Sequence, residues 1–251
     1  MICYELPLNE RVRILLRLEN LFDKIDFFSA RDTAFEHHAT LVALFEILDV
    51  TSRSDLKSDL LQELDKQRAM LEGLQDNPDV SEKALAHILQ DIRTAFRGLL
   101  DIPGRIGGHL RDSEWLMSVR QRMNIPGGAC EFDLPAYHYW LNMTPDARRT
   151  DLNSWITPFA PIRNGINIVL NMLRNSGREF DYVAIQGVFQ QAGSEHQAHL
   201  LRLHVKNEIP CVPEISANKY ALNIRFIPWG AGHKNAVYEE DVPFELIFCS
   251  L

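Results

Sequence analysis

The sequence predicts an α+β protein in which an N-terminal helical domain is followed by a smaller antiparallel β domain. Up to about residue 180, apolar residues recur at three- and four-residue steps, as on helices that pack against a core. Beyond that point they alternate with polar residues, as in strands with one buried face. Because the strands do not alternate with helices, βαβ units are excluded, and we expect domains at residues 1–177 and 178–251.

The helical part begins with a pattern that has a recognisable cap. Asn9 is placed to cap a first helix whose core row is Val12, Leu15, Leu18, Phe22 and Ile25. The same periodicity predicts four more helices, with core rows at 41/45/48, 60/64/71, 85/88/92/96 and 116/119/123. Ser81 is the expected cap of the fourth helix in this series.

Proline and glycine mark the ends of the remaining helices. Pro135 and Pro145 are each expected in the first turn of a helix, where a missing N–H costs nothing. The segment 130–134 before Pro135 is expected to be extended. The last helix has its core row at 162/166/170/173 and is expected to end at Gly177 in a left-handed conformation.

Three strands are predicted from alternation in the C-terminal part, at 201–205, 222–226 and 244–248. Asn218 is expected in a turn that leads into the strand beginning near Tyr220. A short strand at residues 4–6 is expected to pair elsewhere in the chain.

The composition argues against several classes of protein. The 251 residues include 26 basic and 34 acidic side chains, and the formal net charge of −8 disfavours generic binding to nucleic-acid phosphates. No apolar stretch is long enough for a transmembrane helix, and charged residues near the N-terminus argue against a secretory signal. The cysteines are scattered without a C-x-x-C pair, which argues against zinc and favours free thiols in a reducing cytosol.

The sequence indicates neither an active site nor a metal site. His37 and His38 are adjacent, so on a helix they point about 100° apart and cannot chelate one ion. His196 and His199 lack the further ligands that a metal site needs. The glycine pair at 127–128 lacks the Lys-Ser/Thr of a phosphate loop. We therefore expect a protein that is not an enzyme and has no cofactor.

The placement of arginines is the more informative feature. Arg13 and Arg17 share one helix face, and Arg202 and Arg225 lie on the polar faces of two strands. Four more arginines lie within 105–122. Such charges can simply form a solvated surface, but the planar guanidinium also pairs well with carboxylates. Arginine concentrated locally in an acidic protein therefore suggests a partner that carries carboxylates.

The aromatic segment 137–140 has two possible interpretations. It can form a buried aromatic helix that packs on the rest of the fold, or it can line a peptide groove.

Four segments carry a resemblance to a known family. They are Pro7-Leu8-Asn9-Glu10 with Arg13, Arg17 and Glu19; Leu61-Gln62-Glu63-Leu64-Asp65; Arg120-Gln121-Arg122 through Ile125-Pro126-Gly127-Gly128 to Phe132-Asp133-Leu134-Pro135, His138, Trp140 and Leu141; and Ile224-Arg225-Phe226 with Pro228. In this order, over nearly the whole chain, the sequence resembles the ZapD family of bacterial cell-division proteins, the Z-ring-associated proteins D.

The resemblance implies a non-enzymatic cytoplasmic homodimer, recruited to the division ring at midcell. It implies binding to the C-terminal tail of the tubulin-like GTPase FtsZ and bundling of FtsZ filaments, with no membrane or nucleic-acid partner. It also implies a positively charged pocket for that tail, with candidates Arg13, Arg17, Arg53, Arg120, Arg122, His138 and Arg225, and with Lys57 and Lys219 as secondary candidates.

The chain departs from the family pattern at one place. Where a second arginine is expected just before the strand of Arg225, it has Tyr220-Ala221. Either Lys219 substitutes for that arginine, or the pocket is less cationic on this side.

The competing interpretation of the same arginine-rich surface is a nucleic-acid-binding protein, which predicts strongly salt-dependent binding to nucleic acid of any sequence.

Overall fold

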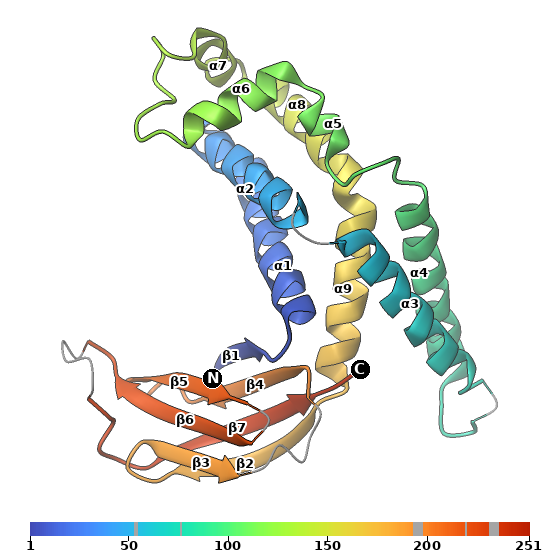
Figure 1. Ribbon diagram of the computed structural model, residues 1–251, viewed down its shortest axis with the longest axis vertical. Helices are drawn as coiled ribbons and strands as arrows, with labels where there is room; N and C mark the ends of the chain where they lie inside the picture. Colours follow the sequence, from blue (N-terminus) through green and yellow to red (C-terminus); the bar gives the residue numbers. More distant parts are fainter. Residues whose placement is uncertain (53–54, 76, 193–197, 219, 231–235) are drawn as a thin grey trace. The chain divides into compact units, whose positions relative to one another are not determined.

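The computed structural model describes residues 1–52, 55–75, 77–192, 198–218, 220–230 and 236–251 (Figure 1). The chain divides into two compact units, Ile14–Val169 and Met1–Arg13 with Leu170–Leu251. The first unit is helical and the second is built mainly from antiparallel strands, which confirms the predicted α+β class. Both boundaries between the units fall inside helices, at α1 (Glu10–Ser29) and α9 (Ala160–Asn175).

The helical unit contains most of α1 and α9 together with the elements between them. These are α2 (Ala34–Ser52), α3 (Leu56–Glu72), α4 (Glu82–Leu100), α5 (Gly108–Arg111), α6 (Glu114–Met123), α7 (Pro135–Leu141), α8 (Pro145–Ile156) and the 3-10 turn Thr157–Phe159. Among the described residues, no helix is both long enough and apolar enough to cross a bilayer.

Local sequence signals begin several of these helices as predicted. Asn9 Oδ1 accepts from the Val12 amide at 2.8 Å, and all five predicted core residues of α1 are buried. Ser81 and Thr144 cap α4 and α8 through their hydroxyls, and prolines occupy the first turns of α7 and α8. Each cap satisfies an amide that the first turn of a helix leaves without a partner.

Two predictions for the helical unit are wrong. Residues 130–134 form a turn rather than an extended segment, because the amides of Asp133 and Leu134 both donate to the Cys130 carbonyl, at 3.1 and 3.0 Å. In α4, Ile88 is 39% exposed, whereas Leu89 is buried. Leu85, Leu89 and Ile92 follow the centre of the apolar stripe, and Ile88 lies at its edge.

The β unit consists of two antiparallel sheets. Its strands are β1 (Ile2–Pro7), β2 (Arg178–Ala184), β3 (Val188–Ala192), β4 (Leu200–Val205), β5 (Cys211–Ala217), β6 (Ala221–Pro228) and β7 (Val242–Cys249). One sheet has the order β1-β4-β7-β2 and the other β3-β6-β5. Leu203 and Leu246 of the first sheet share a core with Ile224 and Phe226 of the second, so the two sheets are packed together.

Two turns of the β unit have specific causes. Asn218 Oδ1 accepts from the amides of Tyr220 and Ala221, at 2.8 and 3.0 Å, which confirms the predicted turn. Gly177 does not adopt the predicted left-handed conformation. A Cβ at this position would collide with Ile247 Cγ2 on β7, so glycine is required by close packing rather than by its φ angle.

Candidate functional site

The candidate site residues are distributed over both units. Arg17, Arg120, Arg122 and His138 belong to the helical unit, and Arg13 and Arg225 belong to the β unit. Arg53 and Lys219 lie outside the described residues.

Two of the three arginines of α1, Arg13 and Arg17, are candidate site residues, and they differ in whether they are already paired. Arg13 Nε lies 3.1 Å from Glu10 Oε2, and its side chain is 43% exposed. Arg17, one turn further along the same face, is exposed and has no ion-pair partner among the residues that the structure describes. Arg17 therefore offers a guanidinium that a partner's carboxylate can reach without displacing an internal one.

The segment from α6 to α7 brings Arg122 and His138 to one acidic turn. Arg122 Nη1 lies 3.5 Å from Asp133 Oδ1, and His138 Nε2 lies 3.7 Å from Glu131 Oε2. Arg120, on another side of α6, pairs with Asp49 of α2. Arg120 and Arg122 are thus already partly neutralised, and an acidic ligand here must compete with the protein's own carboxylates.

Exposed apolar side chains accompany these cations. Phe132 in the turn is 80% exposed, Tyr139 on α7 is 73% exposed, and Ile125 after α6 is 48% exposed. Large apolar groups at the surface next to charges are typical of binding surfaces. The α6–α7 surface therefore combines the cationic and apolar groups that a peptide with both kinds of side chain needs.

The two arginines expected on the polar faces of strands differ in the same way. Arg225 lies on β6, the central strand of its sheet, and is exposed without an ion pair among the described residues. Arg202 Nε instead lies 3.1 Å from Glu5 Oε1, and Arg174 donates two hydrogen bonds of 2.8 Å to the same carboxylate. Burial raises the pKa of Glu5, but Arg174 and Arg202 outweigh it and leave that pKa lowered. The guanidinium of Arg202 is therefore already paired with a carboxylate of the protein itself.

A cationic cavity between the end of α2 and the start of α3 was not anticipated from the sequence. It has a volume of about 500 Å³, and Lys57, Arg105 and Arg111 contribute to its lining. Lys57 Nζ donates to the Ile102 carbonyl at 2.8 Å, while Arg105 is exposed and has no ion pair within the described part of the chain. The sequence pointed to parts of its lining only separately, through the secondary candidate Lys57 and the arginines of 105–122, because the segments that line it are distant in sequence.

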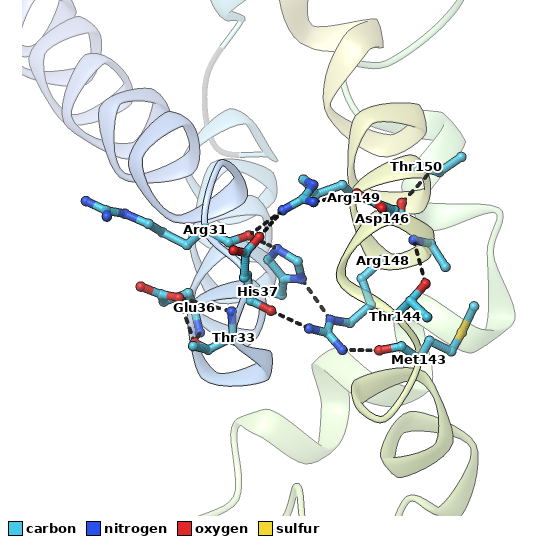
Figure 2. A network of polar contacts seen from close by, with 12 residues as sticks. Arg31, Thr33, Glu36, His37, Met143, Thr144, Asp146, Arg148, Arg149 and Thr150 are labelled. Carbon is cyan, nitrogen blue, oxygen red and sulfur yellow. Dashed lines mark hydrogen bonds and ion pairs between the residues drawn. The ribbon is translucent and has the colours of Figure 1, made fainter.

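A buried polar network of the helical unit joins α2 to α8 (Figure 2). Arg148 on α8 and His37 on α2 are 4% and 0% exposed, and Arg148 Nε donates to His37 Nδ1 at 2.8 Å. Because Nδ1 accepts this bond, the proton of the neutral ring lies on Nε2, from which it donates to the Arg31 carbonyl at 2.8 Å. The remaining bonds of Arg148 go to the carbonyls of Leu141, Met143 and Asp32.

This network predicts that acid destabilises the protein in the range where histidine titrates. Burial lowers the pKa of both His37 and His38, and the neighbouring Arg148 and Arg149 lower that of His37 further. Below about pH 6.5 the unfolded chain then binds more protons than the folded one. The free energy of unfolding is therefore highest above that pH and decreases as the pH falls below it.

Urea denaturation at about pH 7.5 and about pH 5.5 measures this effect, and we expect the lower midpoint at the lower pH. The difference should shrink in His37→Asn, whose amide oxygen can accept from Arg148 Nε. A midpoint that is constant or rises toward pH 5.5 would contradict the prediction.

No cluster of three or more His, Cys, Asp or Glu side chains within the described ranges could hold a metal ion. Taken together, the fold and its surfaces define an α+β protein with a helical unit, a two-sheet β unit and arginines exposed on both.

Comparison with known proteins identifies the family. The ZapD family model, described as a cell division protein, matches residues 16–225. The chain is 84% identical over its full length to Cell division protein ZapD of Nitrosomonas eutropha, all of which is covered. It is 82% identical to that of Nitrosomonas europaea, covering 100% of this chain and 95% of the relative, and 50% identical to that of Dechloromonas aromatica, covering 100% of both. The chain belongs to the ZapD family of cell division proteins.

Proposed function

We propose that the protein binds the C-terminal tail of FtsZ through its exposed arginines and, as a homodimer in the cytoplasm, crosslinks FtsZ filaments in the division ring at midcell. Membership of the ZapD family, shown by the family model over residues 16–225 and by a relative aligned over the full chain, is the observation that carries this proposal. Two exposed arginines without ion pairs among the described residues, Arg17 and Arg225, support it, because such groups are available to a carboxylate-bearing tail.

Several weak contacts must act together in this interaction. An exposed ion pair contributes only about 0–1 kcal/mol, so no single arginine explains binding. Three of the candidate arginines must first leave the protein carboxylates with which they are paired before they bind those of the tail; these are Arg13, Arg120 and Arg122. We therefore assign the larger contributions to Arg17 and Arg225 and smaller ones to the paired cations and His138.

Bundling follows from symmetry and tail flexibility. A two-fold dimer presents each binding surface twice, so one dimer can hold two filaments. Once one tail is bound, a flexible second tail nearby has a high effective concentration, and weak single contacts then produce strong crosslinking.

Co-sedimentation with polymerised FtsZ tests the proposal directly. We expect the protein to pellet with full-length FtsZ filaments and to remain largely in the supernatant with filaments that lack the C-terminal tail. Raising the salt concentration should reduce pelleting, because the Debye length falls to about 8 Å at physiological ionic strength. Equal pelleting with both forms of FtsZ would exclude the tail as the binding partner. Salt-sensitive binding to duplex DNA of arbitrary sequence would favour the nucleic-acid alternative instead.

A further inference from the structure

The helical unit contains an aromatic groove that shares Tyr139 with the α6–α7 surface and whose other lining residues the proposed function does not use. It has a volume of about 530 Å³, and its principal lining residues are Trp115, Tyr139, Trp140, Met143, Asp151 and Trp155. They come from α6, α7 and α8 and the turn between the last two, so the groove exists only after these helices have packed. Its volume lies in the usual range for sites that bind small ligands or single side chains.

The walls of this groove are indole rings that pack against one another. The ring centroids of Trp115 and Trp155 are 5.7 Å apart, those of Trp140 and Trp155 are 5.8 Å apart, and those of Trp115 and Trp140 are 6.0 Å apart. Trp140 is buried, whereas Trp115 and Trp155 are half-buried and Tyr139 is 73% exposed. The ring cluster is therefore fixed from within, while part of its aromatic surface stays accessible to a ligand.

One carboxylate, that of Asp151, lines this groove and has no cationic partner among the described residues. Asp151 Oδ2 accepts from Trp140 Nε1 at 2.9 Å, which orients the group, and its side chain makes no ion pair with any residue that the structure describes. The nearest arginines along α8 are engaged elsewhere, since Arg148 bonds to His37 and three carbonyls and Arg149 pairs with Asp32 and Asp146. The groove thus carries an uncompensated negative charge.

We propose that this groove binds a cationic side chain, arginine or lysine, of a partner peptide in which an apolar residue flanks the cation. Tryptophan faces attract cations through their π-electrons, most strongly for the guanidinium group, and the Asp151 carboxylate supplies the complementary charge. Met143 and Tyr139 extend the apolar wall and accommodate the flanking side chain. The selectivity is opposite to that of the arginine-rich surfaces, which select carboxylates.

Titration of the full-length protein with three capped tripeptides tests this inference. The peptides are acetyl-Leu-Arg-Leu-amide, its citrulline analogue, which has the same shape without the charge, and acetyl-Leu-Glu-Leu-amide. Tryptophan indole N–H resonances provide the readout, because the groove contains Trp115, Trp140 and Trp155 whereas Trp229 lies in the β unit. We expect saturable shifts of the three groove indoles with the arginine peptide, at least five-fold weaker binding of the citrulline peptide, and no binding of the glutamate peptide.

Two variants locate the interaction. Asp151→Asn keeps an oxygen that can accept from Trp140 Nε1 and removes the charge. It should therefore weaken binding of the arginine peptide at least five-fold and leave binding of the citrulline peptide unchanged. Trp155→Leu should weaken binding of both peptides. The matched control, Asp79→Asn, changes an exposed carboxylate of the same unit outside the groove and should have no effect.

Three results of the peptide titrations would overturn the inference, and a fourth concerns the oligomeric state. They are equal binding of the arginine and citrulline peptides, shifts confined to Trp229, and unchanged arginine binding in Asp151→Asn. A change of oligomeric state in Asp151→Asn, with no peptide bound by the wild-type protein, would assign the groove to contacts between copies of the chain and would equally reject the proposal. If Trp155→Leu does not fold, Asp151→Asn still decides the question.

Discussion

Replacing Arg148 with alanine is expected to lower the free energy of unfolding by about 3–5 kcal/mol. The guanidinium is 4% exposed and donates to His37 and to the carbonyls of Leu141, Met143 and Asp32. Its removal leaves the buried ring nitrogen of His37 and three partly buried carbonyl oxygens without these donors and opens a cavity among them. These groups lie on α2, at the end of α7 and in the turns before α2 and α8, so the loss weakens the contact of α8 with these segments.

Urea denaturation at neutral pH measures this loss, and the neighbouring residue provides a matched control. Arg149 is the next arginine on α8, but its side chain is 30% exposed and its ion pairs with Asp32 and Asp146 lie at the surface. Arg149→Ala should therefore shift the midpoint far less than Arg148→Ala. Similar midpoint shifts for the two variants would show that the buried network does not stabilise the fold as argued.

Reversing the charges of Arg17 and Arg225 together is expected to weaken binding of the FtsZ tail by at least about ten-fold, or about 1.4 kcal/mol, and to abolish bundling near physiological salt. Both side chains are exposed and have no ion pair among the described residues, so the substitutions should leave the fold intact. Glutamate at these positions replaces an attraction to the tail carboxylates with a repulsion. Avidity amplifies this loss, because each crosslink needs two tails to stay bound.

The control for this variant keeps the change in net charge and moves it elsewhere. Arg97 on α4 and Arg178 on β2 are also exposed arginines, one in each unit. The double reversal of Arg97 and Arg178 should bundle FtsZ like the wild-type protein, as seen by light scattering and electron microscopy of filaments. Equal loss of bundling in both double variants would indicate an effect of net charge, and no loss in either would remove Arg17 and Arg225 from the site.

The elements of the fold were largely predictable because their signals are local. The core row of α1, the caps at Asn9, Ser81 and Thr144, and the alternation in β4 and β6 all depend on residues a few positions apart. The wrong predictions have both local and long-range causes. The turn at 130–134 forms through the Cys130 carbonyl, three and four residues from its donors, whereas the need for glycine at 177 depends on a neighbour distant in the chain. Gly177 is the long-range case, because a Cβ at this position would collide with Ile247 on β7, whereas its φ angle is not positive.

The candidate site was predictable only as a set of residue types. The sequence located arginines at 120, 122, 202 and 225 but did not reveal which of them are neutralised. Arg120 pairs with Asp49 across 71 residues of sequence. Arg202 and Arg174 both pair with Glu5, and Arg174 lies 169 positions from Glu5 in the sequence. No local pattern encodes such pairs, since they form only when separate elements pack.

The order of the amino acids alone determined that this chain is α+β, where most helices and strands begin, and which family it resembles, because periodicity, capping and motif spacing are properties of short segments. Tertiary structure decided which cations are free, that Arg148 is buried against carbonyls, and that three tryptophans and Asp151 line one groove. The physical reason is that charge pairing, burial and ring contacts act through space, between groups that only folding brings within a few ångströms of each other.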